Sequence, residues 1–483
     1  MKKLLFLIGI LSSGLYGASI DHIQTYSPDY LANQAQTGMI DEVSAYYNPA
    51  GLSRLDKGKY VHLGLQLANG HEKMSYKGKE HKAHLTQLIP NVSLTSVDDN
   101  GAYFFTFGGL AGGGKLEYDG VSGIDVLSDL AQFKPLGVYD KGSTLTGKNL
   151  YEQATLGRAF TVNDQLSISV AGRIVHGSRK LSGTLNIGTN PSTAYKQAKV
   201  QQVTQEVSKA VDAATQGSGL SAAQIAAIKQ QKTTQALTLL QTKMNALQQN
   251  GLSGDMDSKR EAWGYGFQIG INYKVNDKLN LAARYDSRIK MNFKAKGSEN
   301  QLQTTDILGS NIGLSTFYPQ YTIDSKIRRD LPAILSVGAS YKVTDNYLVS
   351  TSANYYFNRH AKMDRVTTFG GHEHGRDYKN GWEIALGNEY KLNDKFTLIG
   401  SLNYANTGAK TASFNDTEYA LNSVTLGAGL RYKYDDTLSI TGSVAHFIYD
   451  KEDGNFKEKY KVNDNQKYHK EITAFGISLT KKF

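Results

Sequence analysis

The feature that most constrains the fold is a hairpin pattern that recurs along the chain beyond residue 90. "IGINYKVNDKLNLAARY", residues 269–285, alternates apolar and polar positions, turns at Val-Asn-Asp-Lys and alternates again. Such a segment predicts two antiparallel strands joined by a tight turn. Further copies read "VGASYKVTDNYLVSTSANYYF", "IALGNEYKLNDKFTLIGSLNY" and "LGAGLRYKYDDTLSITGSVAHF", with looser copies at "TVNDQLSISV" and "LTSVDDNGAYFFTF". Longer polar stretches separate the copies, and this alternation of short turns and long loops is typical of a transmembrane β-barrel.

The tight turns predict the number of strands. Six turns join twelve strands, and the run 60–68 and the terminal "ITAFGISLTKKF" add one strand each. We therefore expect an all-β fold, an antiparallel barrel of fourteen strands with both ends of the barrel sequence on the tight-turn side.

The alternation also predicts which face points outward. A soluble β-sandwich has the same period with its apolar face inward. Two features favour the barrel: Tyr-Lys precedes four of the turns, at Tyr273, Tyr341, Tyr390 and Tyr432, and the chain ends in Phe483. Tyrosines at one level form the aromatic girdle of a membrane interface, and a terminal aromatic residue is usual in outer-membrane barrels.

The first residues predict export. "MKKLLFLIGILSSGLYGAS" has two lysines, a short apolar run and small residues, as in a signal peptide, which we assign to residues 1–17. The sequence contains 0 cysteines, so the exported chain depends on no disulfides. A net charge of +10 favours an anionic lipid surface or an acidic ligand over nucleic acid for an exported protein. The alternative is that most of these charges are scattered lysines that only keep the protein soluble. We expect the outer membrane of a Gram-negative-type bacterium, with outer-membrane lipid and lipopolysaccharide as neighbours.

One segment interrupts the β-pattern. Residues 190–250 are rich in Ala, Gln and Lys, and their apolar residues fall at helical spacing, with Ser221 as an N-cap. By position this segment belongs to an extracellular loop of the barrel. It can form a helical cap over the mouth or an apolar landing groove, and both interpretations stay open.

A compact irregular stretch precedes the first strand. In "SAYYNPAGLSRL", Asn48-Pro49 breaks helix and strand alike, Ala50 follows, and Gly51 frees the backbone. A barrel of fourteen strands is wide enough to conduct unless something fills it. We therefore expect residues 18–58 to form a hatch that plugs the lumen of the barrel, residues 59–483.

These residues resemble the FadL family of outer-membrane long-chain fatty acid transporters. The hatch motif Asn48-Pro49-Ala50-Gly51 carries the resemblance first, and "AWGYGFQIGINYKVNDKLNLAARYDSRIKMNFKAKG", "DLPAILSVGASYKV" and "YKNGWEIALGNEYKLNDKFTL" follow in the family order. The resemblance implies a monomeric, hatch-closed barrel of fourteen strands without enzymatic activity or cofactor. It also implies passive uptake of long-chain fatty acids or similar hydrophobic molecules, which leave sideways into the membrane through a gap at a kinked third strand.

The third strand is "AYFFTFGGLAGGGKLEY", and its glycines are poor at holding a regular ladder. We expect the lateral-gate kink at Gly108, Gly109, Gly112, Gly113 and Gly114.

A fatty acid carboxylate needs a cationic partner. Parity places Arg173, Arg284 and Arg431 in the lumen, and Lys180 and Arg365 fall near basic positions of the family. The alternative is that these arginines pair with inward Asp286 or Glu389 and only line a wet lumen.

The remaining motifs give little information about function. His372, Glu373 and His374, and His71, His81 and His84, are expected in outer loops, solvated and without a metal. A surface adhesin whose extracellular loops bind a host partner is the alternative function. A general diffusion porin is disfavoured because the hatch would block it. The sequence does not identify the hydrophobic ligand.

Overall fold

The computed structural model describes residues 26–120, 122–131, 133–296, 304–305, 311–312, 324–362, 364–366, 372–374, 378–411, 414 and 419–483. The expected signal peptide and residues 18–25 of the expected hatch lie outside this part of the chain. No helix among the described residues is long and apolar enough to cross a membrane.

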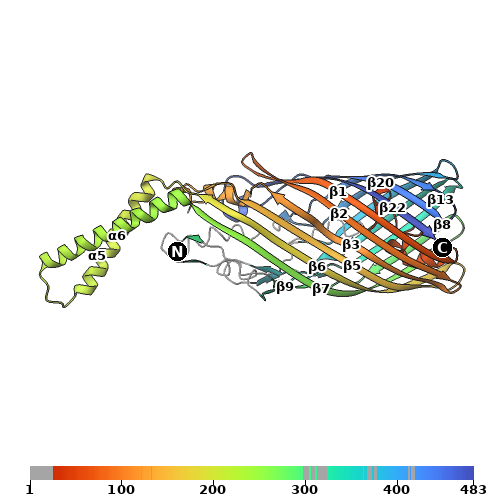
Figure 1. The fold of residues 1–483 in the computed structure, drawn as a ribbon, viewed down its shortest axis with the longest axis horizontal. Coiled ribbons are helices and arrows are strands. Elements are labelled where there is room, and N and C mark those ends of the chain that lie inside the picture. Colours follow the sequence, from red (N-terminus) through yellow and green to blue (C-terminus); the bar gives the residue numbers. More distant parts are fainter. Residues whose placement is uncertain are drawn as a thin grey trace.

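Fourteen antiparallel strands close into a barrel (Figure 1), as the tight turns predicted. Closure occurs where the first and last strands pair, with Tyr60 opposite Lys482 and Ser75 opposite Lys467. The wall strands are β1 (Gly58–Tyr76), β2 (Lys79–Asp98), β3 (Gly101–Tyr118), β5 (Thr144–Thr161), β6 (Leu166–Gly188), β7 (Leu252–Lys274), β8 (Leu279–Asp286), β13 (Ile334–Thr344), β14 (Tyr347–Tyr356), β17 (Gly381–Lys391), β18 (Phe396–Asn406), β19 (Ser423–Lys433), β20 (Leu438–Tyr449) and β22 (Lys467–Lys482).

Two short strands lengthen the wall. β9 (Asn292–Lys296) follows β8 after a few irregular residues and pairs with β7. β12 (Lys326–Arg328) pairs with β9 and precedes β13. The small strands β10 (Thr304–Thr305), β11 (Asn311–Ile312), β15 (Asp364–Val366) and β16 (His372–His374) form two separate pairs, and β21 (Glu452–Asp453) adds to β22.

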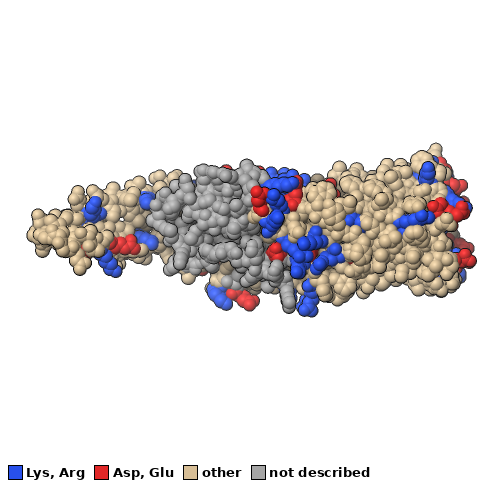
Figure 2. Space-filling view, turned by 90° about the horizontal axis from the view of Figure 1, so that it is seen from below, with Lys and Arg blue, Asp and Glu red and all other residues tan. Residues whose placement is uncertain are grey.

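The outward face is apolar at the predicted parity. On β7, Phe267, Ile269, Ile271 and Tyr273 are exposed, and the alternate residues Gln268 and Asn272 are buried in the lumen. Figure 2 shows a mostly uncharged wall, with charged side chains gathered at the tight-turn end and around the opposite rim. An oily belt between two charged rims is what a bilayer requires of a spanning barrel.

The strands differ in length around the barrel. β6 has 23 residues and β7 has 23, whereas β18 has 11. Because about 9–11 residues cross a bilayer as a strand, the long strands rise well beyond the membrane on the side opposite the tight turns. β1 and β2 are joined there by a two-residue turn, Lys77-Gly78, in which both residues have positive φ. His71, His81 and His84 therefore lie in strands, and the prediction that they occupy an outer loop is wrong.

The helical segment forms an antiparallel hairpin of α5 (Thr193–Thr215) and α6 (Ala222–Asn250). Ser221 caps α6 as predicted, and its hydroxyl accepts a hydrogen bond from the Gln224 N–H. Figure 1 shows the hairpin extending away from the barrel along its long axis, not folded across the mouth. Most of its apolar residues are half-buried along the hairpin or buried at its base, and the large exposed ones are Val200, Leu220 and Leu239. The hairpin thus presents neither the expected cap nor an apolar groove of its own.

Segments of the loops fill the outer part of the barrel. Between β3 and β5 lie α4 (Ser122–Asp125), η3 (Val126–Asp129), η4 (Lys134–Leu136) and β4 (Tyr139–Asp140). Before β22 lies α8 (Phe456–Tyr460), and η6 (Asn358–His360) follows β14. The segment between β3 and β5 and α8 join the upper strand residues in a buried apolar cluster, here called the outer core, which includes Met74, Tyr76, Leu85, Val126, Leu127, Leu130, Phe133, Leu136, Val138, Phe414, Tyr419, Phe447, Phe456 and Tyr468.

Candidate functional site

The hatch lies inside the barrel and follows its inner wall. Its described elements are α2 (Pro28–Ala32), α3 (Ser44–Tyr47) and η2 (Pro49–Arg54). The stretch that sequence patterns exclude from long helices and strands thus forms short helical turns, divided at Asn48, whose φ is −143°. Nearly all residues from Tyr26 to Leu52 are buried.

Inward hydroxyl groups of the wall hold the hatch backbone. Carbonyl oxygens of the hatch accept hydrogen bonds from serines of four different strands, so the hatch is fixed around much of the circumference. The pairs are Ser443 with Pro28 (2.8 Å), Ser401 with Ala32 (2.7 Å), Ser340 with Gly38 (2.8 Å) and Ser167 with Ala50 (2.7 Å).

Glycines of the wall make room for this close approach. A Cβ on Gly427 of β19 would collide with the carbonyl of Leu31, and one on Gly387 of β17 with the side chain of Asn33. The small inward residues of these strands therefore serve the seating of the hatch.

Each residue of the Asn48-Pro49-Ala50-Gly51 motif has a structural task. The Asn48 amide donates to the carbonyl of Met39 (3.0 Å) and to Oδ1 of Asn272 on β7 (2.8 Å). Pro49 begins η2, where no N–H is needed. Ala50 is fully buried, and a Cβ on Gly51 would crowd the Asn48 amide at 2.7 Å. The motif thus presents one amide to the barrel wall.

Aromatic side chains fill the lumen beside the hatch. Tyr26 stacks on Tyr46 with ring centroids 6.1 Å apart, and Tyr30 stacks on Tyr47 at 5.6 Å. They belong to a buried cluster, here called the inner core, which also includes Val43, Leu110, Tyr151, Val175, Ala262, Ile289, Met291, Phe293, Ile327, Leu331, Ile334 and Tyr356.

Two of the predicted cations meet next to the inner core. Arg284 Nε lies 3.1 Å from Asp286, and Arg173 lies 3.5 Å from the same carboxylate. Arg284 also donates to the backbone carbonyl of Tyr46 on the hatch. Arg173 is further held by Gln153 Oε1 at 2.6 Å. Both arginines point inward as parity predicted, and they pair with Asp286 as the alternative interpretation held.

The other three candidates lie apart from this group. Arg431 points inward and forms an ion pair with Glu389 at 3.0 Å. Lys180 on β6 pairs with Asp257 at 3.2 Å and is half-exposed near the outer rim. Arg365 lies in β15, and its side chain is outside the described part of the structure.

A hatch carboxyl lies close to Arg431. Asp41 is outside the membrane-spanning strands, its Oδ1 accepts a hydrogen bond from Ser44 Oγ at 3.1 Å, and its Oδ2 is buried. Burial raises the pKa of Asp41 to about 7, and Arg431 acts in the opposite direction.

The wall is interrupted between β2 and β3. Their ladder pairs Asn91 with Gly108, and the next pair along the wall is Leu85 with Leu116. Residues 86–90 of β2 and 109–115 of β3 are left unpaired with each other. On its other side, the β3–β5 ladder shifts register between Gly109 and Ala111 and again between Ala111 and Gly114.

The glycines of β3 suit this irregular backbone. Gly112 has a φ of 115°, which L-residues rarely adopt, and a Cβ there would strike the carbonyl of Asn149. A Cβ on Gly109 would lie 2.9 Å from Ile89, whose side chain crosses the break. Gly108 is the last regularly paired residue on the tight-turn side of the break. Gly113 and Gly114 lie in the second irregular stretch.

Sequence patterns missed two residues of this break. Pro90 has no N–H to donate and sits next to Asn91, the last paired residue. Leu110 occupies the first bulge and turns into the inner core, where it is 2% exposed. A proline inside a strand was the available signal for the break.

The hatch touches the edge of the break directly. Asn91 donates a hydrogen bond to the hydroxyl of Tyr46 at 2.9 Å, and α3 lies against β3. The hatch, the inner core and the interrupted wall are therefore one connected site.

Known proteins share this architecture. Residues 143–483 match the family described as outer membrane protein transport protein (OMPP1/FadL/TodX). The chain belongs to this family and is an outer-membrane β-barrel.

Related sequences and structures agree. Outer membrane protein P1 of Haemophilus influenzae is 24% identical over 337 residues, covering 66% of this chain and 64% of that protein. The long-chain fatty acid transport protein of Escherichia coli O157:H7 is 20% identical over 273 residues, covering 56% of this chain and 58% of that protein. The chain thus spans less than two thirds of these relatives.

Solved structures with this fold superpose on nearly the whole chain. The toluene transporter TodX of P. putida superposes with a TM-score of 0.63 at 16% identity, covering 95% of this chain and 99% of that one. A Pseudomonas aeruginosa FadL homologue gives 0.62 at 15% identity, covering 95% and 98%. At these identities the likeness concerns the fold.

Proposed function

We propose that the protein takes up long-chain fatty acids or similar hydrophobic molecules by passive diffusion through a hatch-plugged barrel with lateral exit into the membrane. Residues 18–58 act as the stopper, and the barrel works as a monomer surrounded by outer-membrane lipid and lipopolysaccharide. Family membership supports the general class of activity.

The interrupted β2–β3 wall carries the proposal. Leu110 turns inward from the break onto the hatch tyrosines, and Leu88, 54% exposed, faces outward beside it. Apolar side chains therefore lead from the inner core to the outer surface. They do so where the hydrogen-bond ladder between β2 and β3 is already interrupted. A hydrophobic ligand can follow this path without crossing a row of backbone hydrogen bonds.

Lateral exit matches the energetics of an oily ligand. An alkyl tail gains about 0.8 kcal/mol for each CH₂ that leaves water. A water-filled pore offers no such gain, whereas an opening at the membrane level delivers the tail directly into the bilayer.

The arginines next to the inner core can bind an anionic head group. Arg173 and Arg284 share one carboxylate, Asp286, so these three groups carry one net positive charge. Glu383, held by Tyr356 (2.6 Å) and Asn354 (2.7 Å), also acts on Tyr26, and counting this fourth group leaves no net charge. A ligand carboxylate bound here would therefore replace Asp286 as the partner of an arginine. A fatty acid can make this exchange, whereas the toluene named for TodX has no carboxylate.

Restoring the wall tests the proposal. β3 carries two extra residues relative to its neighbours, so deletion of Leu110 and Gly113 should allow a continuous ladder. We expect the variant to reach the outer membrane and to lose uptake of radiolabelled oleate. A deletion of Gly217 and Gly219, which lie in open space between α5 and α6, is the matched control and should retain uptake. Normal uptake by the wall variant would refute lateral exit.

The projecting hairpin favours a second candidate function, adhesion to a host partner. α5 and α6 extend beyond the rest of the structure and bury few residues against the barrel (Figure 1). Deletion of residues 193–250 should abolish cell adhesion and leave oleate uptake intact if the hairpin is an adhesive element. Loss of uptake with unchanged adhesion would assign the hairpin to transport.

A further inference from the structure

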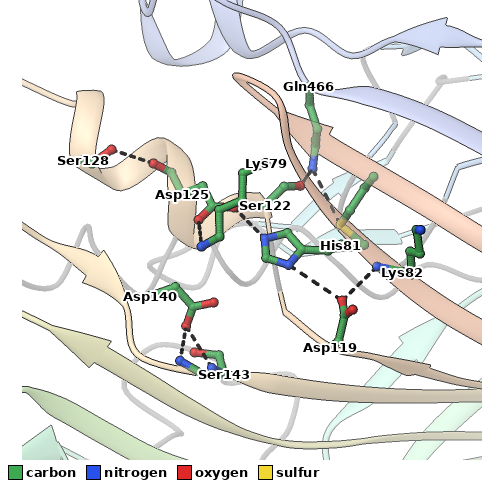
Figure 3. A network of polar contacts seen from close by, with 12 residues as sticks. Lys79, His81, Lys82, Asp119, Ser122, Asp125, Ser128, Asp140, Ser143 and Gln466 are labelled. Carbon is green, nitrogen blue, oxygen red and sulfur yellow. Dashed lines mark hydrogen bonds and ion pairs between the residues drawn. The ribbon is translucent and has the colours of Figure 1, made fainter.

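A histidine and several carboxylates meet where β2 rises beyond the membrane. His81 projects from β2 toward the loop segment 119–143, which carries Asp119, Asp125 and Asp140. Figure 3 shows these side chains converging from the strand, from α4 and from β4. The site is distinct from the inner core and the hatch, because it lies among the outer loops.

The donor atoms are close together. His81 Nε2 lies 2.6 Å from Asp125 Oδ2, and His81 Nδ1 lies 3.8 Å from Asp119 Oδ1. One donor atom each from His81, Asp125 and Asp140 lies within 4.8 Å of the others. Three ligands bound at about 2.0–2.2 Å to one tetrahedral ion lie about 3.3–3.6 Å apart. His81 and Asp125 would therefore separate slightly to admit the ion, and Asp140 would move slightly closer.

The surroundings hold these groups in place. The His81 side chain is 5% exposed, and a Cβ on Gly120 would overlap the imidazole, so the loop backbone lies directly against the ring. Asp140 Oδ1 accepts the backbone N–H groups of Gly142 (3.2 Å) and Ser143 (2.8 Å). Asp119 Oδ1 accepts the N–H of Lys82 at 2.8 Å. Preorganised donors of this kind lower the cost of binding an ion.

The local charge is negative. Asp119, Asp125 and Asp140 supply three carboxylates, and Lys79, 2.6 Å from Asp125 Oδ1, supplies one ammonium group. Lys82 adds its backbone N–H, and its own ammonium pairs with Glu80 at 3.1 Å. A divalent cation would neutralise the remaining two negative charges.

We propose that His81, Asp125 and Asp140 bind a divalent transition-metal cation of the Zn²⁺ class, with water completing the coordination. His81 contributes Nε2, and Asp125 contributes Oδ2 while Lys79 remains on Oδ1. Asp119 faces the other ring nitrogen, where an outer carboxylate orients a metal-bound histidine. Imidazole with two carboxylates suits Zn²⁺ better than Ca²⁺, which prefers six or more oxygen ligands.

The proposed ion would fasten the loop segment to the barrel. The opposite side of this segment contributes Val126, Leu127, Phe133 and Val138 to the outer core, above the inner core and the hatch. Ligands from β2, α4 and β4 therefore connect a strand of the wall to the segment that closes the outer part of the barrel. The structure places His81 in a strand and buries its side chain, contrary to the expected solvated loop, and a bound ion would also contradict the expectation that it binds no metal.

Zinc binding to the full-length mature protein in detergent, purified without a polyhistidine tag, tests the proposal. Isothermal titration calorimetry with ZnCl₂ should show one Zn²⁺ per chain. Asp140→Asn keeps an oxygen for the Gly142 and Ser143 N–H groups and removes the anionic ligand, so it should weaken binding about tenfold or more. His84→Ala alters an exposed histidine on the same strand and should bind zinc normally.

Two further variants test the assignment of the ligands, and a comparison with Ca²⁺ tests the preferred metal. His81→Ala should lose the site, and a His372→Ala/His374→Ala double variant should retain it. Zinc should also slow proteolysis of residues 119–143 in the parent protein and not in Asp140→Asn. Absence of zinc binding, binding unaffected by Asp140→Asn, loss of binding in the double variant, or binding of Ca²⁺ in preference to Zn²⁺ would overturn the proposal.

Discussion

The side chain of Asn48 donates a hydrogen bond to Asn272 Oδ1 at 2.8 Å and so joins the hatch to β7 of the barrel wall. Asn280 on β8 donates to the same Asn272 oxygen at 2.8 Å and to the hatch carbonyl of Gly38 at 2.9 Å. A short chain of amides thus connects Asn48 and Gly38 of the hatch through two neighbouring strands.

Replacing Asn48 tests this connection. Asn48→Ala leaves the oxygen of buried Asn272 and the carbonyl of Met39 with one partner fewer, which costs about 1–3 kcal/mol. We expect a less stable hatch and higher conductance for small solutes in planar bilayers. Ser53→Ala removes a hydroxyl that donates to the carbonyl of Ala50 within η2. It should conduct like the parent protein. Equal conductance of the two variants would show that Asn48 does not anchor the hatch.

The contact between α2 and the barrel wall can be tested by changing a wall residue. A side chain at Gly427 would overlap the carbonyl of Leu31, so Gly427→Val should displace α2 at a cost of about 1–3 kcal/mol. We expect an intact barrel, judged by heat-modifiable mobility on gels, with increased small-solute leakage. Gly442→Val places the same side chain in open space on β20 and should leave leakage unchanged. If both variants stay closed, the hatch does not require this contact.

Arg173 distinguishes an acidic ligand from a neutral one. Arg173→Gln removes a charge that pairs with Asp286, whereas Arg284 still pairs with that carboxylate. A charge-assisted hydrogen bond contributes about 1.5–3 kcal/mol, so oleate affinity should fall about tenfold or more. Binding of oleyl alcohol, measured on the same variant, should be nearly unchanged and controls for damage to the pocket. An equal loss for both ligands would indicate a structural role for Arg173.

The raised pKa of Asp41 predicts that the stability of the hatch depends on pH. Its pKa is raised from 3.8 to about 7, mainly by burial, so the folded hatch holds the proton more tightly than the unfolded chain. The contribution of Asp41 to the free energy of unfolding of the hatch is fully present below pH 4, and it is lost as the pH rises toward 7. The charged groups that act on Asp41 are Arg431, Glu42, Glu389 and Asp29.

Conductance measured at pH 5 and pH 8 tests this expectation. The parent protein should leak more at pH 8, because an ionised Asp41 weakens the seat of the hatch. Asp41→Asn stays neutral and should leak equally at both values. A pH dependence that persists in Asp41→Asn would assign the effect to another group.

The strands and tight turns were predictable because their signals are local. Alternation over residues 269–285, the Asn/Asp turns and the Tyr-Lys pairs each describe neighbours in sequence, and the structure confirms the strand count and the inward and outward faces. The inward direction of Arg173 and Arg284 followed from the same parity.

What sequence patterns missed depends on contacts between distant segments. The β2–β3 break needs the register of two strands, although Pro90 was a local hint of it. The burial of His81 depends on Gly120 and Asp125 folding back over β2. The direction of the α5–α6 hairpin depends on how its base packs, which helical spacing alone does not encode.

Photocrosslinking tests the central claim, a lateral path through the β2–β3 break, most directly. Membranes with the parent protein would be incubated with an oleate analogue that carries a photoreactive group at its tail, and labelled peptides identified by mass spectrometry. We predict labelling within residues 86–90 and 109–115, reduced in the protein that lacks Leu110 and Gly113. Labelling that avoids these residues and concentrates on the tight turns at the opposite end of the lumen would contradict lateral exit.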